Sequence, residues 1–400
     1  SSGRGVETEH LALARKVAER CPVLLTNDGV LPLGPRAGER ILVAGPAAVT
    51  RDHLGAWVQR FGVEPEHGLG DALKAAMPEA RIDVLDGCSP IDPSPAFLDE
   101  FRRVAPGYDL VILALNEPSD LTGEASSRAD LRLPGDQEEL VRVACASGVP
   151  VVAVLMNGRP LDISAWIDLP NAVLEAWHLG TTGPEVIADI LGGAVAPTGR
   201  LPMAFPRSVG QLPAIHHAHE NTGRPAARGG SVQPKSFDVG LDGPANIQEF
   251  FTSKYRDLEL GPLFEFGHGL SYSPIEVRSI ALDSATVSRK ALDEGLRVRI
   301  RVENTGSRDV DHALLLYVRD PLASIARPVK SLAAFERVHV PAGTLIEVET
   351  GIEAESLSFW SEAEGGPLLE EGEFELRVEG SNGPTITRFA LVANDSEEDA

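Results

Sequence analysis

Residues 110–131 read LVILALNEPSDLTGEASSRADL, and their pattern indicates the fold class of the first half of the chain. Its first six residues are all apolar, which is typical of a parallel strand covered on both faces. A polar loop follows directly. Loops beyond the carboxyl ends of parallel strands are where open α/β sheets bind ligands. We therefore expect this loop to carry the chemistry of the domain.

Similar strands and helical patterns alternate on both sides of this stretch. Further strands are predicted at 23–25, 41–44, 82–85, 149–155 and 172–176, and helices at 7–19, 68–76, 94–104, 135–146 and 183–191. This alternation predicts a doubly wound α/β sandwich with a mostly parallel sheet. The strand–helix units number about five, too few for an eightfold barrel.

The second half has a different character. Residues 192–269 hold many Pro and Gly and little periodicity, and 226–247 resemble an insertion. After Tyr272, short alternating segments at 296–302, 313–318, 345–352 and 374–378 predict an all-β sandwich. The expected organisation is an α/β domain over 1–225, an irregular linker or insertion over 226–271, the β-sandwich over 272–394 and an acidic tail over 395–400.

Composition excludes several classes of function. The formal net charge of -23 disfavours nucleic-acid and anionic-membrane partners, whereas a neutral, hydroxyl-rich ligand such as a sugar fits better. The sequence contains no run of 18 apolar residues, so it predicts no membrane span. Cys21, Cys88 and Cys145 have neither metal-ligand nor disulfide spacing and are expected to be small core residues. The opening SSGRG has no initiating Met, so we expect the natural N-terminus to lie upstream.

Glu124 is the candidate catalytic residue of the polar loop. A loop Glu with Ser and Arg nearby can donate or accept a proton, although a solvated loop Glu is the simpler interpretation of these residues alone. Arg128 and Asp130 are candidate substrate-binding or loop-orienting residues. They either orient Glu124 or face another domain, or they form a local salt bridge that shapes the loop.

Several strings resemble glycoside hydrolase family 3, of the bacterial periplasmic β-glucosidase type, in the family's order. They are VLLTNDGVLPL at 23–33, GEASSRADL at 123–131, LPGDQ at 133–137, MNGRPL at 156–161, EAWHLGTTG at 175–183, PTGRLPMAFP at 197–206, NTGRP at 221–225, FEFGHGLSY at 264–272 and RPVKSL at 327–332 with Phe335. The resemblance covers nearly the whole chain. It implies the family's C-terminal α/β domain followed by an immunoglobulin-like, fibronectin type III-like domain, with the family's N-terminal barrel absent.

The resemblance also implies a function. Family members hydrolyse β-linked glucosides with retention, using an Asp nucleophile on a (β/α)8 barrel and a Glu on a second-domain loop as acid/base. By position that Glu is Glu124. The expected partners are a β-linked glucoside or oligosaccharide and a barrel encoded upstream or on another chain, with no cofactor. The resemblance favours a periplasmic or secreted location. The alternative is a non-catalytic module of the same family that binds carbohydrate or protein.

Other residues carry weaker signals. His216, His217 and His219 resemble a metal cluster, but they fall in a Pro-flanked loop, and we expect no metal there. Trp57, Trp177 and Trp360 are expected to be core or interface anchors rather than sugar platforms. The NGRP string at 157–160 is a strand-ending turn or an interface element near the cleft. Gly45-Pro46 lacks the further glycines of a dinucleotide loop.

Overall fold

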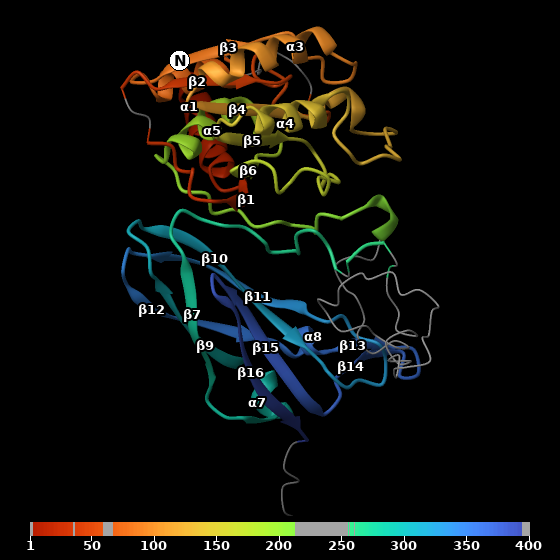
Figure 1. Ribbon diagram of the computed structural model, residues 1–400. Helices are drawn as coiled ribbons and strands as arrows, with labels where there is room; N and C mark the ends of the chain where they lie inside the picture. The colour runs from red at the N-terminus through yellow and green to blue at the C-terminus, as the bar shows by residue number, and fades with distance from the viewer. Residues whose placement is uncertain are drawn as a thin grey trace, which may run out of the picture. The chain divides into compact units, whose positions relative to one another are not determined.

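The predicted apolar runs form one six-stranded sheet in the order β1-β6-β5-β4-β2-β3. This is seen in a computed structural model that describes residues 3–34, 37–58, 67–212, 255, 257–259 and 261–393 (Figure 1). Its strands are β1 (Val23–Asn27), β2 (Arg40–Ala44), β3 (Arg81–Leu85), β4 (Leu110–Asn116), β5 (Val151–Met156) and β6 (Ala172–Glu175). All neighbours are parallel except β1, which runs antiparallel to β6.

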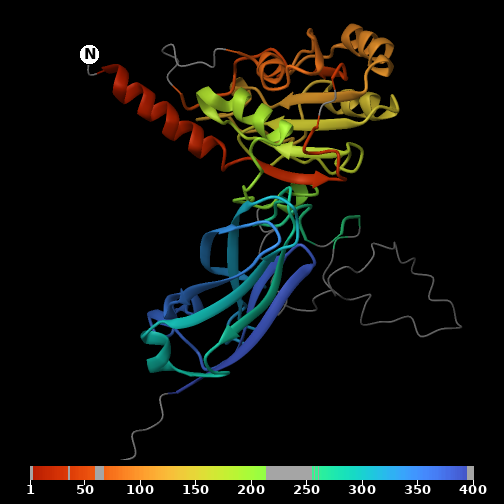
Figure 2. The same ribbon diagram turned by 90° about the vertical axis from the view of Figure 1, so that its left-hand side faces the viewer.

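Helices cover both faces of this sheet (Figures 1 and 2). The covering helices are α2 (Leu69–Ala76), α3 (Pro95–Val104), α4 (Gln137–Ala146) and α5 (Gly183–Gly192), with short 3-10 turns η1 (Ala105–Gly107), η2 (Ser119–Leu121), η3 (Gly180–Thr182) and η4 (Val209–Gln211). Helix α1 (Gly3–Ala18) instead projects from the sheet, and its Leu11, Leu13 and Val17 are exposed (Figure 2). Along β5, alternate side chains enter one core with α2 and α5 and the other core with α3 and α4. Burial on both faces explains why these strands are continuous apolar runs. The predicted α/β layer is confirmed.

The C-terminal residues fold as a β-sandwich, as predicted. Its elements are β7 (Ile275–Leu282), β8 (Thr286–Ser288), α7 (Arg289–Asp293), β9 (Leu296–Asn304), β10 (Val310–Arg319), β11 (Ser331–Val340), β12 (Leu345–Ile352), α8 (Ala354–Leu357), β13 (Phe359–Ser361), β14 (Gly366–Leu368), β15 (Gly372–Gly380) and β16 (Gly383–Val392). A sheet β11-β10-β15-β16-β8 and a sheet β12-β9-β7 share one apolar core.

The described chain divides into two compact units. The first comprises the residues up to Leu212 together with a returning segment, Pro262–Tyr272. The sandwich begins at Ser273. The returning segment has no helix or strand of its own but is fastened to the α/β unit, since the Tyr272 hydroxyl donates to Ile190 O at 2.7 Å and Leu270 bridges Leu24. Most of the predicted linker or insertion, and the acidic tail, lie outside the described residues.

Two smaller expectations need correction. Cys21 is exposed, so it is not a core residue, whereas Cys88 and Cys145 are half-buried against the core beside α3 and α4. Trp57 and Trp360 are 74% and 66% exposed, which rules them out as core anchors. Gly45 serves a tight turn, because its φ is +109° and an added Cβ would lie 2.5 Å from Ala114 O.

Candidate active site

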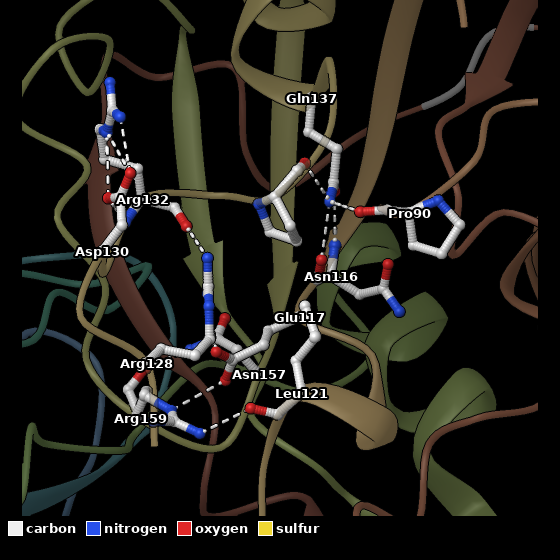
Figure 3. Close-up of polar contacts among 11 residues, drawn as sticks. Pro90, Asn116, Glu117, Leu121, Arg128, Asp130, Arg132, Gln137, Asn157 and Arg159 are labelled. Atoms are coloured by element: carbon white, nitrogen blue, oxygen red, sulfur yellow. Dashed lines mark hydrogen bonds and ion pairs between the residues drawn. The ribbon is translucent and has the colours of Figure 1, made fainter. Parts of the chain in front are cut away.

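The polar loop begins where β4 ends, as predicted from the sequence. The Glu117 N–H donates to Met156 O at 3.1 Å, which joins the ends of β4 and β5. Buried Gln137 at the start of α4 clamps Asn116 by accepting from its N–H at 2.9 Å and donating to its carbonyl at 2.8 Å (Figure 3). The same amide donates to Pro90 O and Pro134 O. The loop therefore starts from a fixed point at the carboxyl edge of the sheet.

Glu124 is exposed and lies between two residues in the left-handed region. The φ angles are +109° at Gly123 and +59° at Ala125. Only Gly adopts such angles freely, so Ala125 keeps this conformation because its surroundings impose it. An added Cβ at Gly123 would lie 2.8 Å from the Cβ of Ala56. The turn that presents Glu124 thus packs closely on the segment that contains Ala56.

An open cavity of about 480 Å³ lies beside Glu124. Its lining residues are Gly55, Ala56, Trp57, Ser119, Asp120, Thr122, Gly123 and Glu124. The walls come from two loops that are joined by a hydrogen bond of 3.0 Å from the Ser119 N–H to Asp52 Oδ2. Trp57 contributes an exposed indole to this wall, so it is placed where a ligand of the cavity can reach it.

Glu117 lies under the loop between two arginines. Arg128 Nη1 is 2.8 Å from Glu117 Oε1, and Arg159 Nε is 3.1 Å from Glu117 Oε2 (Figure 3). The Glu117 side chain is fully buried, and those of Arg128 and Arg159 are 15% and 24% exposed. A buried carboxylate needs such paired, hydrogen-bonded partners. We call Glu117, Arg128 and Arg159 the buried triad.

Asp130 binds Arg132 rather than a member of the buried triad. Its carboxylate accepts from Arg132 Nη2 at 2.6 Å and from Arg132 Nε at 3.0 and 3.1 Å, and both side chains are more than half exposed. The hydrogen bonds from Arg132 lower the pKa of Asp130 to about 2. Arg128 and Asp130 thus form separate ion pairs, Arg128 with Glu117 and Asp130 with Arg132.

The NGRP string after β5 forms a strand-ending turn that also reaches the Glu124 loop. Asn157 Nδ2 donates to Arg159 O at 2.7 Å and to Glu175 Oε2 at 3.2 Å. Arg159 Nη2 donates to Leu121 O at 3.1 Å. Glu175, at the end of β6, also accepts from the Trp177 N–H at 2.9 Å. The carboxyl ends of β4, β5 and β6 are therefore linked beneath the loop.

Glu175 is fully buried, and desolvation raises its pKa well above 4.5. Above that pH the unfolded chain loses a proton that the folded chain keeps, so stability falls as pH rises toward the folded-state pKa. We expect Glu175→Gln to remove this slope, because an amide does not titrate. Urea unfolding at pH 5, 6 and 7, followed by the helix signal at 222 nm, measures it. Equal slopes for the parent chain and the variant would show that Glu175 is ionised in the fold.

His178 packs against Gly55 in the cavity wall and against Gly158. Both of its ring nitrogens are buried and meet no hydrogen-bond partner among the described residues. Burial lowers the pKa of His178. Its Cδ2 lies 3.0 Å from where a Cβ would stand at Gly55 and 3.4 Å from the same point at Gly158. The ring therefore acts as a packing surface where the two glycines allow close approach.

No group of three or more potential metal ligands occurs in the ranges that the structure describes. His216, His217 and His219 lie outside those ranges. No helix in the described part of the chain is long and apolar enough to cross a membrane.

Comparison with known proteins identifies two matching family models. Residues 22–272 match the glycosyl hydrolase family 3 C-terminal domain, and residues 312–382 match a fibronectin type III-like domain. A periplasmic β-glucosidase from Salmonella typhimurium is 35% identical over 88% of this chain and 46% of its own length. A β-xylosidase from Formosa agariphila is 30% identical over 94% of this chain and 49% of its own length.

A solved structure shares the fold. The β-glucosidase from Listeria innocua in complex with isofagomine matches with a TM-score of 0.80 and 30% identity, covering 95% of this chain and 50% of that protein. The chain spans about half the length of the relatives that it matches.

Proposed function

The chain belongs to glycoside hydrolase family 3, and from that premise we propose that it supplies the general acid/base of a retaining β-glucosidase. In this proposal Glu124 is the acid/base, and the nucleophile lies on a (β/α)8 barrel outside these 400 residues. We call this chain together with that barrel, encoded in one polypeptide or in two, the complete enzyme. The β-sandwich is its accessory domain.

The observation that carries the proposal is the position of Glu124 at an exposed turn beside an open cavity. A proton donor must come within hydrogen-bonding distance of the atom that it protonates. Glu117 and Glu175 cannot do this from their buried positions. Contrary to the expectation from the sequence, the indole of Trp57 is exposed on the cavity wall and offers an apolar face against which the C–H groups of a sugar can pack.

The chemistry requires two carboxyl groups roughly 5–5.5 Å apart. In the first step the barrel carboxylate attacks the anomeric carbon, the bond to the leaving oxygen breaks, and the Glu124 carboxyl gives its proton to that oxygen. In the second step the Glu124 carboxylate takes a proton from water. The water oxygen attacks the anomeric carbon and displaces the barrel carboxylate, so the configuration is retained. Glu124 ends the cycle protonated and ready for the next one.

The names of the relatives support the substrate class and the location. They include β-glucosidases and a β-xylosidase, so a β-linked glucoside is the proposed substrate. One of these relatives is named as periplasmic, which supports a site of action in the periplasm or outside the cell. Within the loop we propose that Arg128 is loop-orienting, and that Asp130 shapes the loop locally through Arg132.

Binding of the barrel should protect the turn that carries Glu124. We expect amide hydrogen exchange in residues 123–130 to slow by about tenfold or more when a matching barrel binds, because the partner surface covers an exposed turn. Hydrogen exchange followed by mass spectrometry, with and without the barrel, measures this.

Residues 147–149 serve as the control, because they lie before the amino end of β5, whereas Glu124 lies beyond the carboxyl ends of the strands. Their exchange should not change. Equal exchange of residues 123–130 in both samples, despite demonstrated binding, would mean that the turn does not reach the barrel, and the assignment of Glu124 would fail.

A further inference from the structure

We propose that the buried triad is the positioning device for Glu124, with Glu117 and Arg159 as positioning residues in addition to Arg128. The inference rests on the proposed function, because it assumes that the carboxyl of Glu124 reacts. Each arginine of the triad performs two tasks at once. One nitrogen binds the Glu117 carboxylate, and another binds a main-chain carbonyl of the loop.

The two carbonyls lie on either side of Glu124. Arg159 Nη2 donates to Leu121 O at 3.1 Å, three residues before Glu124, and Arg128 Nη2 donates to Arg132 O at 2.9 Å, eight residues after it (Figure 3). Both guanidinium groups meet on the same carboxylate. The triad therefore joins the two ends of the loop through one buried group.

The Glu117 carboxylate is itself held to the sheet. Glu117 is the first residue after β4, and its N–H donates to Met156 O at the end of β5. The Asn157 side chain donates to Arg159 O and to the Glu175 carboxyl at the end of β6. The connection thus runs from the carboxyl ends of three strands, through the triad, to both ends of the loop. Catalytic groups held by rigid elements and buried hydrogen bonds keep their position better than groups on a free loop.

The conformation around Glu124 needs this support. Ala125 has a φ of +59°, and Gly123 packs on Ala56. Between Leu121 and Arg132 the described loop contains no helix or strand after η2. Fixed ends limit the ways in which such a loop can relax, so the strained turn at Glu124 persists.

The planar fork of arginine is essential to this role. A guanidinium can bind a carboxylate and a carbonyl in fixed directions, whereas the ammonium of lysine is a point charge on a flexible stem. Arg159→Lys keeps the charge beside Glu117 but loses the paired contact with Leu121 O. This substitution therefore tests positioning with the least damage to the buried charge balance.

The test compares two substrates in the complete enzyme. The dinitrophenolate group of a dinitrophenyl β-glucoside leaves without protonation by an acid, whereas the alkoxide of an alkyl β-glucoside must be protonated as it leaves. We expect Arg159→Lys to lower kcat/KM for the alkyl substrate by about 10–100-fold, since displacement of a catalytic group by 1 Å can cost about 100-fold. The dinitrophenyl substrate should change less than about threefold, because its departure does not use the proton.

Glu375→Gln is the matched control. Glu375 is also a buried carboxylate between two arginines, with Arg319 Nη1 at 3.3 Å and Arg388 Nη2 at 2.7 Å, but it lies in the β-sandwich. Any effect that comes from a less stable fold should lower kcat/KM equally for both substrates. We expect Glu375→Gln to leave the ratio of the two kcat/KM values unchanged.

A second measurement uses the 400-residue chain without a barrel. Glu117→Gln should speed hydrogen exchange in residues 121–132 by about tenfold, because both arginines lose their shared anchor, and Glu375→Gln should not. Unchanged hydrogen exchange in Glu117→Gln would overturn the inference. An equal loss of kcat/KM for both substrates in Arg159→Lys would also overturn it.

Glu124→Gln separates this inference from the proposed function. If the loss in kcat/KM caused by Glu124→Gln depends on the leaving group and the loss caused by Arg159→Lys does not, only the positioning inference is wrong. If Glu124→Gln shows no such dependence, Glu124 is not the acid/base, and both fail.

Discussion

The purified chain alone should hydrolyse no aryl β-glucoside, and addition of the barrel should produce turnover in proportion to the complex formed. Retention requires a nucleophilic carboxylate on the face of the sugar opposite the acid/base. The proposed function assigns the chain only the second of these groups. Release of the aryl alcohol, measured at increasing barrel concentration, gives the result directly.

Asp120 makes this prediction a strict one, because it is a second carboxyl on the wall of the same cavity. Turnover by the chain alone that disappears in Asp120→Asn or Glu124→Gln would contradict a divided site. Barrel binding with no turnover by the complex would instead favour a non-catalytic module.

In the complete enzyme, Glu124→Gln should lower kcat/KM for alkyl β-glucosides by about 10²–10⁴-fold, the usual worth of general acid–base catalysis. The amide keeps the size of the side chain but has no proton to give. The loss should shrink as the leaving group becomes more acidic, because less protonation is needed. Steady-state rates across a series of aryl and alkyl glucosides measure this dependence.

Glu100→Gln is the control for loss of a surface carboxyl, since Glu100 lies on α3 in an exposed pair with Arg103. It should match the parent enzyme. Parent rates for Glu124→Gln on alkyl glucosides, with a large loss in Asp120→Asn, would move the acid/base role to Asp120.

The α/β domain could be predicted because its strands are buried on both faces. The runs at β4 and β5 contain only apolar residues up to Leu115 and Met156, and such short continuous runs are typical of parallel strands covered on both faces. The antiparallel direction of β1 was not predicted, because strand order and direction depend on contacts with β6 that lie far along the chain. Strands β7, β11 and β16 were also missed. They are edge strands or are largely exposed on one face, so their apolar pattern is weak.

The candidate site was predicted only in part. The place of Glu124 followed from the rule that ligands bind beyond the carboxyl ends of parallel strands. Glu117 was missed and Arg159 was singled out only as part of the NGRP turn, since their ion pair spans 42 positions and exists only once β4 and β5 are neighbours. A usable signal was present nonetheless. Both residues come within three positions of the end of a buried strand, where a charged side chain needs a partner.

The most direct test of the account is the product that the Glu124→Gln complete enzyme forms with azide from a dinitrophenyl β-glucoside. Without a general base, the glycosyl-enzyme should accumulate, and azide, which needs no deprotonation, should attack the face that water uses. Turnover should be faster with azide than without it, and the product should be a β-glucosyl azide, identified by the coupling constant of its anomeric proton. An α-glucosyl azide, or no azide adduct at all, would contradict the assignment of Glu124 as the acid/base.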